Sequence, residues 1–232
     1  MVKLTPIQDI ISLLFPQVCA ACGTLLYRKE ETVCLSCRHL LPVTGYETVP
    51  DNPLARVFWG RVKFEAVTAC YFFSKKGKIQ NLIHELKYRG NRDAGHFLGV
   101  QTGKSLLKTN WHKQIDCIVP VPLHPKRLRQ RGFNQSEVLA QGINEVTGIK
   151  IIDDNLVRVL ASATQTRKSR SARWENVKDI FAVKRPGELK GNHILLVDDV
   201  ITTGSTIEAC AMTLAQCGEI NISVAAAACA PV

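Results

Sequence analysis

The sequence predicts an α/β protein in which helices flank a mainly parallel sheet and a small four-cysteine module comes first. Three observations predict this class. From residue 66 onward, apolar runs typical of buried strands alternate with runs of helical periodicity. The run 194–206 places two adjacent aspartates after an apolar strand and before a helix. Two Cys-x2-Cys pairs precede residue 40, a spacing typical of a metal-binding module.

The two cysteine pairs predict the first element, a structural zinc site. Cys19 and Cys22 are separated from Cys34 and Cys37 by a stretch long enough for a hairpin, so four thiolates can close one tetrahedral zinc. Gly23 directly follows the second cysteine, as a tight knuckle turn requires. Two disulfides or a redox dithiol are the alternatives. We expect His39 to be a surface residue, and the other five cysteines to be small core residues: Cys70, Cys117, Cys210, Cys217 and Cys229.

The segment before the cysteines predicts a short amphipathic helix. Thr5 is a suitable cap, Pro6 suits the first helical position, and apolar residues recur at helical spacing up to Phe15. Gln8 and Asp9 interrupt the apolar run, which a secretion signal would avoid, and no stretch is long enough to span a membrane. We therefore expect a cytoplasmic protein without membrane insertion.

A polar, proline-bounded connection at 42–53 predicts a boundary between a module at 1–50 and an α/β domain at 51–232. The expected strands are 66–73, 115–121, a short one near 155–160, the strand ending at the aspartates, and 222–229. The expected helices are 78–88, 95–107, 135–146 and one that ends near Cys217 and Gly218.

The segment after Val197 carries the most specific chemistry. Two carboxylates are followed by a small, hydroxyl-rich loop at the start of a helix, where backbone N–H groups lack intrahelical partners. Such a loop suits a phosphate, and the carboxylates suit the neighbouring hydroxyls of a sugar, so ribose 5-phosphate satisfies both halves. We expect Gly204 to let the backbone approach the anion. The predicted binding residues are Asp198, Asp199, Thr202, Thr203, Gly204, Ser205 and Thr206.

Basic residues predict an acidic partner, either a phosphorylated small molecule or a nucleic acid. The chain has 232 residues, a net charge of +10 and a pI near 9.3. One acid-free window includes Arg127 and Arg131 after a proline-rich strand end, and the other, at 164–177, includes Arg173 and Trp174. The alternative for the first window is a solvated charge run. The second suits either a lid over a ligand or base stacking on single-stranded nucleic acid.

The segment Val197–Thr206 resembles the signature of type I phosphoribosyltransferases. Together with the four-cysteine module, it resembles the competence protein F (ComF) family through Leu86–Gly90, Val119–His124 and Arg127–Gln135. The resemblance implies a phosphoribosyltransferase fold that binds phosphoribosyl pyrophosphate (PRPP) with Mg²⁺ held through the ligand. It also implies that three arginines bind this ligand: Arg127 and Arg131 at the connection that holds the pyrophosphate, and Arg173 on the lid.

Two functional hypotheses follow. The first is a PRPP-binding phosphoribosyltransferase of unknown acceptor that serves bacterial competence and the uptake or use of DNA. The second is a non-catalytic protein of the competence machinery that keeps the fold and binds single-stranded DNA or acts as an adaptor. A further possibility is that the zinc module docks onto a competence helicase.

Overall fold

The computed structural model describes residues 16–27, 29–159 and 180–231. The predicted N-terminal helix and the basic segment 164–177, with Arg173, lie outside the described residues. The main sheet has the strand order β1-β7-β6-β2-β3, and every neighbouring pair is parallel, as the sequence predicts. Its strands are β1 (Ala66–Phe72), β2 (Cys117–Pro120), β3 (Lys150–Ile151), β6 (His193–Ile201) and β7 (Asn221–Cys229).

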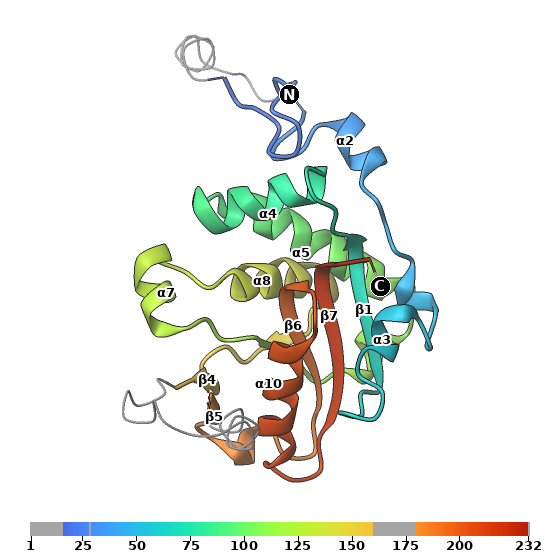
Figure 1. The fold of residues 1–232 in the computed structure, drawn as a ribbon, viewed down its shortest axis with the longest axis vertical. Coiled ribbons are helices and arrows are strands. Elements are labelled where there is room, and N and C mark those ends of the chain that lie inside the picture. Colours follow the sequence, from blue (N-terminus) through green and yellow to red (C-terminus); the bar gives the residue numbers. More distant parts are fainter. Residues whose placement is uncertain (1–15, 28, 160–179, 232) are drawn as a thin grey trace, which may run out of the picture.

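Two layers of helices bury the two faces of this sheet (Figure 1). One layer consists of α4 (Lys78–Tyr88), α5 (Arg92–Leu107) and α8 (Gln135–Thr147). The other contains α10 (Ser205–Ala215) and the short α3 (Pro53–Arg56). Alternation along β6 produces this division, because Leu195 and Val197 pack in the first apolar core while Ile194 and Leu196 pack in the second. The remaining described helices are α2 (Leu35–Leu40), η1 (Tyr46–Thr48), α6 (Trp111–Gln114), α7 (Pro125–Arg131) and η2 (Pro186–Glu188).

The strand expected near 155–160 is present but lies outside the main sheet. It is β4 (Leu156–Arg158), which pairs antiparallel with β5 (Phe181–Val183) in a separate two-stranded sheet. The Val159 N–H donates to the carbonyl of Ile180 at 2.9 Å. The pair therefore brings Val159 and Ile180 together.

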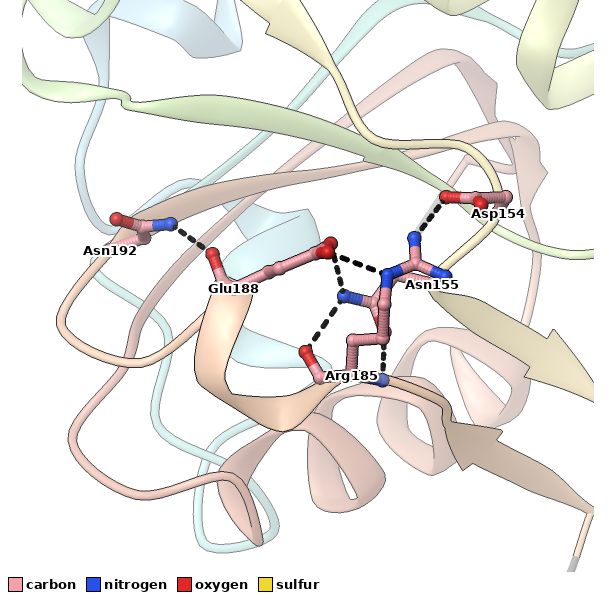
Figure 2. A network of polar contacts seen from close by, with 5 residues as sticks. All are labelled: Asp154, Asn155, Arg185, Glu188 and Asn192. Atoms are coloured by element: carbon pink, nitrogen blue, oxygen red, sulfur yellow. Dashed lines mark hydrogen bonds and ion pairs between the residues drawn. The ribbon is translucent and has the colours of Figure 1, made fainter.

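A polar network holds the base of this hairpin (Figure 2). The side chain of Asn155, which is fully buried, donates to the Arg185 carbonyl at 2.9 Å and accepts from the Arg185 N–H at 2.8 Å. Arg185 also pairs with Asp154 at 2.5 Å and with Glu188 at 2.6 Å. These contacts join the residues before β4 to the residues after β5, and so hold the two ends of the hairpin together.

The four-cysteine module stands beyond α4 (Figure 1). Ala21 and Val33 of the module are buried in the same apolar core as Leu82 of α4, and the Asn81 side chain donates to the Ala21 carbonyl at 2.8 Å. The connection that follows runs along the edge of β1, where the Phe72 N–H donates to the Pro42 carbonyl at 2.8 Å. The predicted boundary at 42–53 thus coincides with a segment that is hydrogen-bonded to the sheet.

Within the described ranges, no helix combines the length and the apolar character that a bilayer crossing requires.

Candidate phosphoribosyl site and metal centre

The two aspartates lie within β6, three and two residues before it ends. The sequence places them where the strand stops, but β6 continues to Ile201, and Asp198 and Val200 remain in register with Ala226 and Ala228 of β7. The pairing continues because β7 is itself long and apolar, and offers a partner along the whole of β6. The sheet backbone therefore holds both carboxylates, instead of a loop.

Asp198 is held by two donors. The Ser136 hydroxyl at the start of α8 donates to its carboxylate at 3.1 Å, and the Asp199 N–H donates to the same oxygen at 2.8 Å. Burial, reinforced by the neighbouring charge of Asp199, raises the pKa of Asp198 to about 7. At neutral pH this carboxyl is therefore able to gain or lose a proton.

Asp199 has a cationic partner instead. The ammonium of Lys87, in the last turn of α4, lies 2.8 Å from each of its two carboxylate oxygens. Asp199 is buried and Lys87 is largely so, so the pair is shielded from screening by salt. The two neighbouring acids thus differ in their surroundings. Asp199 is paired with the ammonium of Lys87, whereas Asp198 is bound by the Ser136 hydroxyl and has a pKa near neutral pH.

The loop after β6 supplies the third part of the site. Its residues Thr202, Thr203, Ser205 and Thr206 are exposed, and together with Asp198 they line a small pocket. Gly204 adopts a φ of 75° immediately before α10, whose first N–H groups have no carbonyl one turn earlier to pair with. Backbone donors and hydroxyls therefore meet beside the carboxylates, an arrangement suited to an anion next to a diol.

The structure gives a reason for glycine at position 204 that the sequence does not show. A Cβ there would lie 2.5 Å from Cε1 and 2.7 Å from Cζ of Phe58. The space beside Gly204 is thus filled by an aromatic ring of this chain. Its positive φ and this close approach both require glycine.

The first basic window forms a helix, α7, which the sequence pattern does not predict. Pro125 begins α7, and the ring of His124 caps it by accepting from the Lys126 N–H at 3.1 Å. Arg127 is exposed on α7, and the guanidinium carbon of Arg131 lies 5.7 Å from the centre of the Tyr88 ring. Because Tyr88 follows Lys87 in α4, this contact links the basic helix to the element that neutralises Asp199.

The four predicted metal ligands come together. The sulfur atoms of Cys19, Cys22, Cys34 and Cys37 all lie within 4.8 Å of one another, and those of Cys22 and Cys34 are 3.8 Å apart. A tetrahedral zinc with bonds of about 2.3 Å separates its sulfur ligands by about 3.8 Å. The donor set therefore fits a zinc ion.

Backbone N–H groups inside the module donate to cysteine sulfurs, while burial raises the pKa of Cys37. The Cys34 N–H donates to Cys19 Sγ at 3.3 Å, and the Cys37 N–H donates to Cys34 Sγ at 3.4 Å. The side chain and backbone of Thr24 lower the pKa of Cys22 to about 6. Gly23 makes the expected turn, with a φ of 78° and its N–H bonded to the Cys19 carbonyl. His39 is exposed and outside the cluster, as expected.

Sequence reasoning missed three contacts of the site. Lys87 lies in the segment Leu86–Gly90 that contributes to the family resemblance, but nothing local indicates that its partner is Asp199. Ser136 is visible only as a polar residue at a helix start, and Phe58 only as an aromatic residue in the connection. Each contact joins residues more than 60 positions apart.

Comparison with known proteins assigns the family. The phosphoribosyl transferase domain family matches residues 79–228, from α4 to the end of β7. The DNA utilization protein YhgH of Salmonella typhimurium is 34% identical over 210 residues, which cover 89% of this chain and 88% of that protein. The chain belongs to the competence protein F family of phosphoribosyl transferase-like proteins. Within this family, competence protein F of Haemophilus influenzae is 33% identical over 55% of each chain, and competence protein ComFC of Bacillus subtilis is 24% identical over 84% of this chain and 82% of that protein.

Among solved structures, the glutamine PRPP amidotransferase of B. subtilis is similar to 57% of this chain, with 22% identity and a TM-score of 0.41. The chain spans about a quarter of that enzyme's length.

Proposed function

We propose that this ComF-family protein binds PRPP at the end of β6 and transfers its ribose 5-phosphate to an acceptor. Asp198 and Asp199 accept hydrogen bonds from the two ribose hydroxyls. The N–H groups and hydroxyls of 202–206 hold the 5-phosphate. The observation that carries the proposal is the pair of acids, one bound by Ser136 and the other by Lys87, directly beside the exposed loop.

Binding of the sugar also explains why Lys87 is near the acids. Two adjacent carboxylates repel each other in a buried place, and an ammonium that touches both oxygens of one of them reduces the repulsion. The other acid is then free to ionise and accept from a hydroxyl. The diol is thereby oriented while the loop holds the phosphate, which fixes the carbon that reacts.

In the transfer, the bond between C1 of the ribose and pyrophosphate breaks, and a bond from C1 to the acceptor forms as the acceptor loses a proton. Arg127 and Arg131 on α7 supply positive charge for the departing pyrophosphate. Bound through the diol and pyrophosphate, Mg²⁺ would add to that charge. This chain's residues bind and orient, and we assign no general base.

The four-cysteine cluster suits zinc in a structural role. Four thiolates close a tetrahedral site and leave no position for a substrate. All nine cysteines, each within the described ranges, are free thiols, which suits a reducing compartment such as the cytoplasm.

Calorimetry with PRPP and Mg²⁺ tests binding, and pyrophosphate release in the presence of bases, amines and oligonucleotides tests transfer. We expect binding in the micromolar range, about −8 kcal/mol, and pyrophosphate release with at least one acceptor class. Failure to bind PRPP would refute the proposal. Binding without release would support the non-catalytic form of the hypothesis.

One observation favours a second candidate function, the binding of single-stranded DNA. Tyr88 is 71% exposed and lies against Arg131 of the basic helix α7, a combination that suits base stacking beside phosphate contacts. The name "DNA utilization protein" of the relatives agrees with this candidate. We expect retention of an oligonucleotide at low salt and a steep loss as salt is added. The helicase alternative predicts instead that a partner is captured by the native protein and lost with Cys34→Ser.

A further inference from the structure

We propose that Phe58 is a positioning residue that supports the phosphate loop from beneath and keeps it in the conformation that receives the 5-phosphate. The inference rests on the proposed function, because it assigns a role within the same site. Phe58 belongs to the connection before β1, outside the matched family domain at 79–228. It lies 146 positions from Gly204, the residue it touches.

The loop has a single buried point of support. In the described stretch 202–206, Gly204 is buried, and Thr202, Thr203, Ser205 and Thr206 are all exposed. The ring of Phe58 occupies the place of the missing side chain at Gly204. An exposed loop of small polar residues would otherwise sample several conformations, and binding a phosphate would have to order it.

Phe58 is itself firmly held. It is 1% exposed, and its ring meets the ring of Phe64 edge to face, with 5.0 Å between the two centres. It lies two residues after α3, which Asn52 caps, and the Asn52 side chain also donates to the Val67 carbonyl of β1 at 2.8 Å. The ring is therefore fixed relative to the sheet, and by its contact with Gly204 it restricts the conformations of the loop.

A second contact ties the same segment to the helix after the loop. The guanidinium of Arg61 pairs with Glu208 in the first turn of α10 at 2.8 Å. Arg61 also lies over the Phe58 ring, 5.9 Å from its centre. The connection thus holds both the loop, through Phe58, and the start of α10, through Arg61.

The main test compares Phe58→Leu with Trp59→Leu, a matched control. Trp59 lies on the same segment but is 61% exposed. We expect Phe58→Leu to weaken binding of ribose 5-phosphate about fivefold or more. Without the ring, part of the binding free energy is used to order the loop. We expect binding of pyrophosphate with Mg²⁺ to change less than about twofold, because that ligand does not use the loop. Equal losses for both ligands would refute a specific role of Phe58 and leave it as an ordinary core residue.

A measurement without ligand separates this inference from the proposed function. Hydrogen exchange followed by mass spectrometry reports opening of the peptide that contains 202–206. We expect faster exchange in Phe58→Leu than in the native protein, with Trp59→Leu unchanged. Unchanged exchange in Phe58→Leu overturns the inference whether or not the protein binds PRPP. Faster exchange in a protein that fails to bind PRPP supports the inference and refutes the function.

A double-mutant cycle tests the contact itself. Gly204→Ala alone places a methyl group against the Phe58 ring at a positive φ. In the Phe58→Ala background the collision disappears and only the backbone strain remains. We expect the loss of melting temperature in the double variant to be smaller than the sum of the single losses. An additive result would show that the ring does not constrain Gly204, against the inference.

Discussion

The four-cysteine module and the candidate phosphoribosyl site both gather polar groups, but they hold them by different means. In the module, short loops and α2 bring four thiols within 4.8 Å of one another, and a few small apolar residues such as Ala21 and Val33 pack beside them. In the site, Asp198 and Asp199 lie on a nine-residue strand between two helical layers. We therefore expect the module to depend on a bound metal for its stability, whereas the sheet holds the two carboxylates in place without a ligand.

The largest effect should come from the module. Cys34→Ser removes one thiolate and the acceptor of the Cys37 N–H, so we expect bound zinc to fall from about one equivalent to nearly none. The melting temperature should drop by several degrees. Metal analysis and thermal unfolding measure both effects.

Cys217→Ser is the control, because Cys217 is half-buried and outside the cluster. If Cys34→Ser kept its zinc and its melting temperature, the module would not depend on a complete set of four thiolates for its stability. The expected difference between the two regions would then be wrong.

An intermediate effect is expected at the site. Asp199→Asn removes an ionised acceptor and leaves Lys87 without its carboxylate. A hydrogen bond to a charged group is worth about 1.5–3 kcal/mol, so we expect PRPP to bind about tenfold or more weakly. Calorimetry measures the change, with Asp154→Asn as control, because Asp154 is exposed and pairs with Arg185 instead. Unaltered affinity in Asp199→Asn would exclude this carboxylate from the diol.

The last expected effect is a dependence of stability on pH that arises from Asp198. Its pKa is raised to about 7 in the folded protein, far above the usual value of about 4. Between these two values the folded state binds a proton that the unfolded state has released, so the wild type loses stability as pH rises through this window and levels off above pH 7. The Asp198→Asn variant has no carboxyl group at this position, so its stability does not fall with pH for this reason.

Thermal unfolding from about pH 4 to 8 measures this effect. The melting temperature of Asp198→Asn, relative to that of the wild type, should rise with pH up to about pH 7. A constant difference across the range would mean that Asp198 is ionised throughout. In that case the sheet would hold Asp198 and Asp199 side by side as two charged carboxylates before any ligand binds. The difference between the site and the four-cysteine module would then be larger.

Much of the fold could be predicted because its elements have strong local periodicity. The helix expected at 78–88 coincides with α4, and the strands expected at 66–73 and 222–229 agree with β1 and β7 to within one residue at each end. α7 was missed because its exposed, basic sequence has no apolar face, and the caps at His124 and Gly132 form only in the folded chain. β4 was assigned to the wrong sheet because its antiparallel partner, β5, is too short to be recognised by its pattern.

The sequence by itself determined most of the long strands and helices, the four thiols, and the acids followed by a hydroxyl-rich loop, because each of these depends on residues close together in the chain. Only the tertiary structure decided that Lys87 neutralises Asp199, that Ser136 binds Asp198 and that Phe58 lies beneath Gly204. These pairs are distant along the chain, and local periodicity records whether a residue is buried but not which residue it meets. Packing of the helices and of the connection onto the sheet makes that choice.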